Sequence, residues 1–287
     1  CCIWPIHGQR TVEIRSGSES KRCACRLKQM PLITPHPDLA AKNVEMLRPM
    51  HWLALAWKDV ERCPTAGAMH GLILAIIGGG LFWFARHEFW WIAAMLSVCM
   101  IVAPLLATGL YDISRRLERG EEATLADAFR IWTSGDKRLI HFGLLLALSS
   151  AGWLLCSAAL VHWMLPASVH TPADFLRLVV LQANFGLFEI WVLMSALIAA
   201  PMFASTLVTI PLLMDHPTLT VQQAVLTSWR VVAMNPLAMA CWASLLCLFT
   251  ALGIGSAFLG LIAVVPMLGH ASWHAYRDLV VYDPAVH

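Results

Sequence analysis

The sequence predicts an all-α membrane protein, a polytopic bundle of six transmembrane helices. Of the 287 residues, 59% are hydrophobic and 13% are charged, whereas a soluble domain has about 25% charged residues. Too few charged side chains remain to cover a soluble globule of this length, and the formal net charge of +2 gives no general attraction to nucleic acid. The composition therefore excludes a soluble enzyme, a disordered chain and a nucleic-acid-binding protein.

The first segment, residues 1–44, differs in composition from the rest, because residues 1–29 are polar and basic. It contains no long apolar run that ends in a small-residue cleavage site, so no signal peptide is expected. We expect a flexible extension or an over-extended start here, a membrane domain over residues 45–282 and a short tail over residues 283–287. Cys23 and Cys25 form a lone C-x-C pair, which is weak evidence for a metal site.

Six apolar runs approach the roughly 20 residues that a helix needs to cross a bilayer. In chain order they are residues 66–85, 89–110, 139–165, 185–214, 237–252 and 255–275. The runs are continuously apolar rather than alternating, which favours helices over the strands of a membrane barrel. Pro201 and Pro211 interrupt the fourth run. The last two runs are joined only around residues 253–255, which predicts a tight antiparallel hairpin.

Lysine and arginine residues near the spans lie mostly on one side. Twelve of them flank the spans on the side that holds both termini, and only Arg86 and Arg177 lie on the other side. Because positively charged loops stay in the cytoplasm, this asymmetry predicts that both termini are cytoplasmic.

A short amphipathic segment followed by a spanning hairpin recurs three times. The short segments end near Trp57, Trp132 and Trp229. Thr124 and Thr220 are each followed three residues later by Asp127 or Gln223, as in a helix capping box. The segments are too short and too polar to span, so we place them at the cytoplasmic interface. There they either dock a partner or lipid, or only fix the tilt of the hairpins.

Polar residues inside the apolar runs are candidate functional residues, because a charge in the bilayer is costly. Glu189 is the one acidic residue well inside a run, and it serves either as a relay carboxylate or as a group that reaches the interface. His270 and His274 share one helix face, and His70 or His141 would be the partner that a two-histidine haem or metal site needs. Alternatively, these histidines only form hydrogen bonds with neighbouring helices.

The loop after the second span contains six acidic and six basic residues between positions 112 and 138. This balance indicates a solvated loop with internal ion pairs, or else a docking patch for a cytoplasmic partner or anionic lipid. The docking candidates in it are Arg115, Arg116 and Arg119. No nucleotide-binding loop, nucleophile motif or metalloprotease motif occurs, so the sequence predicts no catalytic residue, no metal ligand set and no assigned cofactor.

Three strings resemble one protein family. They are ATGLYDISRRLERGE (107–121), TIPLLMDHPTLTVQQAVLTSWRVVAMNP (209–236) and PMLGHASWHAYRDLV (266–280). Together they are similar to the bacterial integral-membrane family called domain of unknown function 2189, over about residues 45–282. The resemblance implies a six-span inner-membrane protein without an established reaction. Labels on some members refer to subunit I of cytochrome c oxidases, which has more spans and a denser set of ligating histidines than this chain.

Three functions are open at this point. The first is a non-catalytic accessory, assembly or interaction subunit of a larger membrane complex, such as a respiratory one. The second is a transporter of a small solute, lipid or ion, with a polar cavity lined by Glu189. The third is a haem- or metal-binding membrane protein. The first is favoured, because the chain carries no reactive constellation and the amphipathic segments recur.

Overall fold

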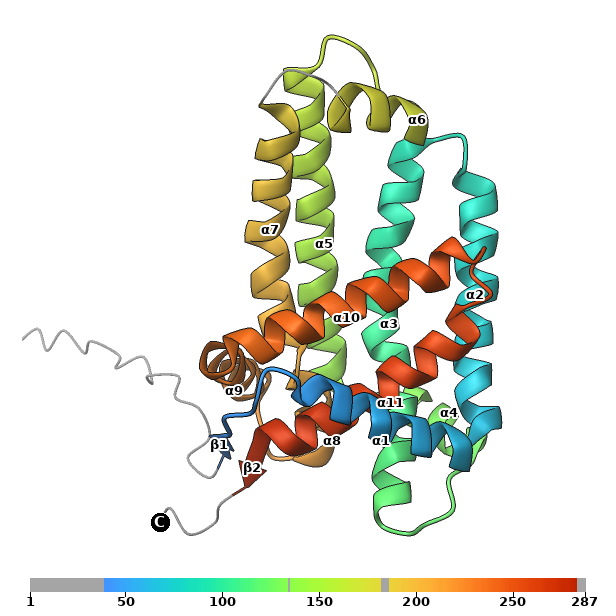
Figure 1. Ribbon diagram of the computed structural model, residues 1–287, viewed down its shortest axis with the longest axis vertical. Helices are drawn as coiled ribbons and strands as arrows, with labels where there is room; N and C mark the ends of the chain where they lie inside the picture. The colour runs from blue at the N-terminus through green and yellow to red at the C-terminus, as the bar shows by residue number, and fades with distance from the viewer. Residues whose placement is uncertain (1–38, 134, 182–185, 283–287) are drawn as a thin grey trace, which may run out of the picture. The chain divides into compact units, whose positions relative to one another are not determined.

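The computed structural model describes residues 39–133, 135–181 and 186–282. Figure 1 shows two tall helical hairpins above a layer of shorter helices, which we call the basal end. The first hairpin consists of α2 (Pro64–Ala85) and α3 (Phe89–Glu118), and the second of α5 (Lys137–Met164) and α7 (Leu187–Thr206). The short α6 (Pro172–Phe175) and a π-helical turn, Leu176–Val180, join α5 to α7 at the opposite end.

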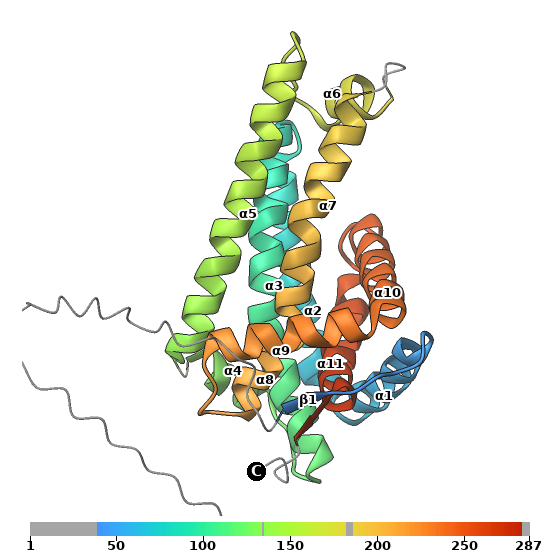
Figure 2. The same cartoon turned by 90° about the vertical axis from the view of Figure 1, so that its left-hand side faces the viewer.

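A third hairpin consists of α10 (Pro236–Gly255) and α11 (Leu261–Leu279). It lies oblique to the tall helices and reaches only part of their height (Figures 1 and 2). Its turn falls after Gly255, slightly later than the sequence predicts, with positive φ values at Ala257 (53°) and Phe258 (68°). Such φ values are unfavourable for residues with a Cβ. The Phe258 ring packs against Phe82 of α2 with 5.8 Å between ring centroids, and this contact helps to hold the turn.

The amphipathic segments form three basal helices, as the sequence predicts. They are α1 (Arg48–Arg62), α4 (Leu125–Thr133) and α9 (Val221–Met234). Each packs on the second helix of a hairpin: α1 on α11, α4 on α3, and α9 on α7 and its continuation α8 (Thr209–Asp215). These matching contacts are consistent with a three-unit repeat, which stays a prediction.

Two of the three predicted anchoring tryptophans make equivalent hydrogen bonds. The indole of Trp132 donates to the Leu106 carbonyl of α3 at 3.2 Å, and that of Trp229 donates to Ser205 Oγ of α7 at 2.8 Å. Trp57 differs, because it donates to Glu61 of its own helix and is half exposed. In α1 the buried indole is Trp52, which packs edge-on against Trp242 of α10.

Two short strands in the described part of the chain form a small sheet, in which β1 (Leu39–Ala41) pairs antiparallel with β2 (Val280–Tyr282). Residues 39–44 fall in the segment expected to be flexible, yet they are packed against the protein. The side chain of Asn235 holds this stretch, because its Oδ1 accepts from Val44 N at 2.8 Å and its Nδ2 donates to the Lys42 carbonyl at 2.9 Å. The rest of that expectation, residues 1–38, and the predicted tail at 283–287 lie outside the described residues.

Five helices in the described ranges are long and apolar enough to cross a membrane. They are α2, α3, α5, α7 together with α8, and α10. The predicted sixth span, 255–275, is not confirmed as a span. Its helix α11 begins at Leu261, and the C-terminal half carries His270, His274 and Arg277 and packs inside the basal end. Because β1 and β2 are paired, the two ends of the described chain lie at the same end of the molecule.

The spanning helices are loosely packed compared with the basal end. Only 7% to 44% of each apolar window is buried inside the protein. At the basal end, by contrast, the large side chains of Trp52, Trp242 and Trp273 are no more than 1% exposed. The apolar surface of the tall hairpins must therefore be covered by lipid or by other proteins.

Candidate functional site

A cluster of buried polar side chains lies where α1, α3 and α11 meet at the basal end. We call it the basal polar cluster; its members are Asp59, Ser114, His270 and His274. Each is at most 9% exposed. Because a buried polar group is costly without a hydrogen bond, the partners of these four groups decide whether the helices can pack here.

The hydrogen bonds of the cluster converge on one carboxylate oxygen. Asp59 Oδ2 accepts from Ser114 Oγ at 2.7 Å and from His274 Nε2 at 2.8 Å. An ionised carboxylate can only accept hydrogen bonds, so the Ser114 hydroxyl donates its single proton to Asp59. Ser114 Oγ then accepts from His270 Nδ1 at 2.7 Å. It follows that neutral His270 carries its proton on Nδ1, and its buried Nε2 has no hydrogen-bond partner among the described residues.

Burial and hydrogen bonding fix the charges in the cluster. Burial alone raises the pKa of Asp59, but the hydrogen bonds from His274 and Ser114 outweigh it and hold the pKa below its ordinary value. Burial lowers the pKa of His270 to about 4 against the opposing attraction of Asp59. The second nitrogen of His274 lies 3.8 Å from Glu118 of α3. The cluster thus holds an ionised Asp59, a neutral His270 and a His274 ring that faces a carboxylate on both sides.

These charges make the fold sensitive to acid. Folded His270 takes up a proton only near pH 4, whereas the unfolded chain takes it up near the ordinary value of 6.5. Between these two pH values the unfolded state binds more protons, so stability decreases as the pH is lowered through this range. The full effect is about 3 kcal/mol, because a pKa difference of one unit corresponds to about 1.4 kcal/mol.

Thermal unfolding of the detergent-solubilised protein at several pH values checks this expectation. His270→Gln should lose most of the decrease between pH 6.5 and 4, while His141→Gln, on the exposed face of α5, should keep it. The same pH profile in His270→Gln and the natural protein would contradict the assignment.

A second carboxylate ties α1 and β1 to the end of α11. Asp278 pairs with Lys42 at 3.0 Å and with Arg48 at 2.5 Å, and it accepts a hydrogen bond from the Trp52 indole at 3.0 Å. Burial raises the pKa of Asp278, but the hydrogen bonds from Arg48, Trp52 and Lys42 outweigh it and lower the pKa to about 2. This contact explains why the chain is ordered before α1 begins.

The structure buries three of the four predicted histidines, His70, His270 and His274, inside the basal end. His70 of α2 donates from Nδ1 to the Ala66 carbonyl at 2.6 Å, and its buried Nε2 points at α3, where a Cβ on Gly109 would lie 2.6 Å away. This contact leaves no room for a porphyrin on that nitrogen. His141 lies apart on α5 and donates to the Lys137 carbonyl at 2.7 Å. In the described part of the chain, no three potential metal ligands gather.

Glu189 lies at the N-terminus of α7, far from the basal end. Its Oε2 accepts a hydrogen bond from Gly186 N at 2.8 Å, so it caps the helix, and its side chain is exposed. Neither of the two grooves described below is lined by Glu189.

The predicted docking arginines are mostly engaged inside the protein. Asp112 is only 1% exposed and pairs with Arg115 and, at 2.9 Å, with Arg116. Arg116 also reaches Asp127 of α4 at 3.3 Å. Of the three candidates, Arg119 at the end of α3 is exposed. The expectation of a solvated loop was wrong for Asp112, because α3 continues past residue 110 and α4 folds back against it.

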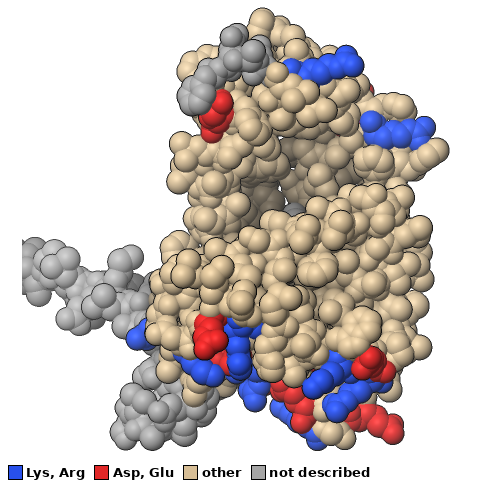
Figure 3. All heavy atoms as spheres, viewed as in Figure 1, with Lys and Arg blue, Asp and Glu red and all other residues tan. Residues whose placement is uncertain are grey.

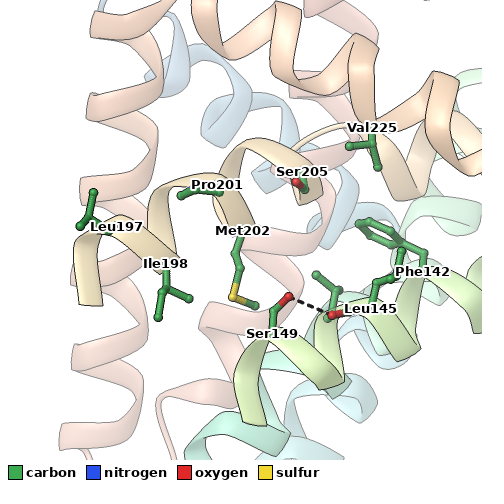
Figure 4. A pocket seen from close by; sticks show the side chains of 10 residues that line it. Phe142, Leu145, Ser149, Leu197, Ile198, Pro201, Met202, Ser205 and Val225 are labelled. Carbon is green, nitrogen blue, oxygen red and sulfur yellow. Dashed lines mark hydrogen bonds between the residues drawn. The ribbon is translucent and has the colours of Figure 1, made fainter. Parts of the chain in front are cut away.

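Two apolar grooves open between the tall helices near the basal end. The α5–α7 groove has a volume of about 300 Å³, and the α3–α5 groove about 460 Å³. Figure 4 shows the first, with Ile198 and Met202 of α7 pointing toward Leu145 and Ser149 of α5. The second is lined by residues of α3, α4 and α5.

The fold and the site define a multi-pass helical membrane protein with polar groups gathered at one end. Residues 92–215, from α3 to α8, match the family described as Predicted integral membrane protein (DUF2189). The match confirms the resemblance for the first of the three strings and the start of the second, while the third lies outside it. No curated protein and no solved structure matches the chain.

Proposed function

We propose that this chain is a non-catalytic accessory, assembly or interaction subunit of a larger complex in the bacterial inner membrane. The observation that carries the proposal is the contrast between the two ends of the molecule. Most of the buried polar side chains of the basal end form hydrogen bonds or ion pairs with one another, whereas most of the apolar surface of the spans is left uncovered within the protein. Such a molecule is built to present surface to other molecules in the bilayer rather than to a substrate.

The lateral surface offers a place where a partner helix fits. Figure 3 shows a hollow without charged side chains in the upper half of the molecule, between the two tall hairpins and above α10. In a bilayer, helices associate through close packing rather than through the hydrophobic effect. A concave surface without charged side chains therefore favours a transmembrane helix of another subunit, and a respiratory complex is one such assembly.

The distribution of charge supports the predicted orientation. On the face seen in Figure 3, most of the acidic and basic side chains gather at the basal end. Positively charged segments stay on the cytoplasmic side, so we infer that the basal end and the two chain termini face the cytoplasm.

Purification of the tagged full chain in a mild detergent, at native abundance, tests the proposal. We expect it to elute in a particle larger than its own 31.7 kDa plus a micelle, together with at least one other membrane protein in constant ratio. A monodisperse particle that contains this chain alone would refute the proposal.

The other two hypotheses are tested separately. A transporter needs a polar path through the membrane, and Glu189, proposed for it, caps a helix end instead. A haem or metal role stays a prediction, and a visible absorption spectrum together with metal analysis of the purified protein tests it.

A further inference from the structure

The α3–α5 groove has apolar walls and an apolar floor. Leu105 and Leu106 of α3 form one wall, Leu139, Ile140 and Gly143 of α5 form the other, and Ile131 and Trp132 of α4 form the floor. The indole N–H of Trp132 donates its hydrogen bond to the Leu106 carbonyl, so the ring offers only an apolar surface to a ligand. This lining suits a hydrocarbon chain.

A glycine in the α5 wall, Gly143, lies opposite Leu105 of the α3 wall. A Cβ placed on Gly143 would lie 3.3 Å from Leu105 Cδ1, which is tight, so a larger side chain there would fill the groove. Gly152 on the same helix has no neighbour within 4 Å. The two positions therefore provide a matched pair for substitution.

The polar group in the lining, Asp136, is neutralised within the protein. It caps α5 by accepting from Arg138 N at 2.8 Å, and it pairs with Arg138 Nη2 at 2.6 Å. Arg138 itself is held by the carbonyls of Leu213, His216 and Leu219. Neither charge of this pair is available to a ligand.

Three basic residues are next in sequence to residues of the lining, at the level of the basal helices. Arg130 adjoins Ile131, and its side chain is 71% exposed with one weak ion pair to Asp127 at 3.4 Å. Lys137 and His141 lie one turn apart on α5, next to Asp136 and Ile140 of the lining, and both are exposed. An apolar groove with a basic rim at the membrane surface complements a lipid whose phosphate is anionic.

We propose that the α3–α5 groove binds one acyl chain of an anionic glycerophospholipid from the bilayer leaflet at the basal end. Arg130 and Lys137 hold the phosphate of this lipid. The groove accommodates the hydrocarbon, because its lining offers no free polar partner. The rim selects the headgroup, because basic side chains near the membrane surface attract anionic lipids. This site is independent of the partner proposed above, since it lies between helices of the chain itself.

Native mass spectrometry of the full chain measures lipid retention after incubation in detergent with phosphatidylglycerol or phosphatidylcholine. We expect one phosphatidylglycerol molecule to be retained about tenfold more strongly than phosphatidylcholine. Arg130→Gln combined with Lys137→Gln should abolish this preference, while Arg86→Gln combined with Arg177→Gln, at the opposite end, should leave it unchanged. Both pairs lie on the surface, so the fold should tolerate them.

Gly143→Leu should lower the retention of phosphatidylglycerol at least tenfold, whereas Gly152→Leu should not. Equal retention of the two lipids by the natural protein would overturn the proposal, as would an unchanged preference in the double arginine–lysine variant. A photoreactive residue at Ile140 that cross-links to another protein rather than to lipid would also overturn it, because a partner helix would then fill the groove.

Discussion

Asp59→Ala should lower the free energy of unfolding by about 3 kcal/mol or more. The substitution leaves two buried donors, Ser114 Oγ and His274 Nε2, without their acceptor, and each unsatisfied buried group costs about 1–3 kcal/mol. The Ser114 hydroxyl then turns toward His270 and competes with its Nδ1 proton, so the tautomer of His270 is no longer fixed. The packing of α1, α3 and α11 against one another is therefore weakened.

Chemical unfolding in detergent, followed by tryptophan fluorescence, measures this loss. Asp59→Asn should cost less, because its carbonyl oxygen still accepts one hydrogen bond. Lys58→Ala, on the exposed side of the same helix, is the matched control and should change stability by less than about 0.5 kcal/mol. If the Asp59→Ala variant were as stable as the Lys58→Ala variant, the basal polar cluster would make no contribution to the free energy of unfolding.

Gly71→Ala should disrupt the contact between α2 and α11, at a cost of about 3 kcal/mol. An added Cβ would lie 2.5 Å from both the Ile262 Cα and the Leu261 carbonyl oxygen. Both are backbone atoms of α11 that no change of rotamer can move. The two helices must therefore separate, and the packing between them is lost.

Gly80→Ala on the same helix is the control, because a Cβ there meets nothing within 4 Å. It should be neutral or stabilising by about 0.5–1 kcal/mol, since alanine favours the helix over glycine. Comparison of the two melting temperatures in one detergent separates close packing from helix propensity. Equal melting temperatures would mean that α2 and α11 are not in close contact.

Local patterns predicted the elements that depend on local physics. The apolar runs gave five of the spans to within a few residues, apart from the extension of α3 beyond residue 110, because a backbone in lipid must satisfy its hydrogen bonds within the helix. The capping box of Thr220 and Gln223 is confirmed, with Thr220 N donating to Gln223 Oε1 at 3.1 Å. Thr124 makes the corresponding backbone contact with Asp127 at 3.0 Å.

Other features had no local signal. In the sequence, Asp59 is one polar residue on an amphipathic helix, and Ser114 is a small residue before two arginines. Nothing within either segment indicates that Asp59 Oδ2 accepts hydrogen bonds from both Ser114 and His274. These two residues lie 55 and 215 positions from Asp59 in the sequence, respectively. The pairing of β1 with β2 was missed for the same reason, since each strand has only three residues.

The sequence by itself determined that this chain is a helical membrane protein with three short amphipathic helices and charge concentrated at one end. These properties follow from hydrophobicity, periodicity and loop charge, which depend on residues close together in the sequence. Only the tertiary structure decided that α11 turns its polar half into the protein, that Asp112 is buried and that Glu189 caps a helix. The first depends on a distant helix, because Asp59 of α1 accepts the hydrogen bond of His274. Asp112 and Glu189 instead bond to groups three or four residues away, and their surroundings depend on where the helices end, since α3 continues past residue 110 and α7 begins only at Leu187.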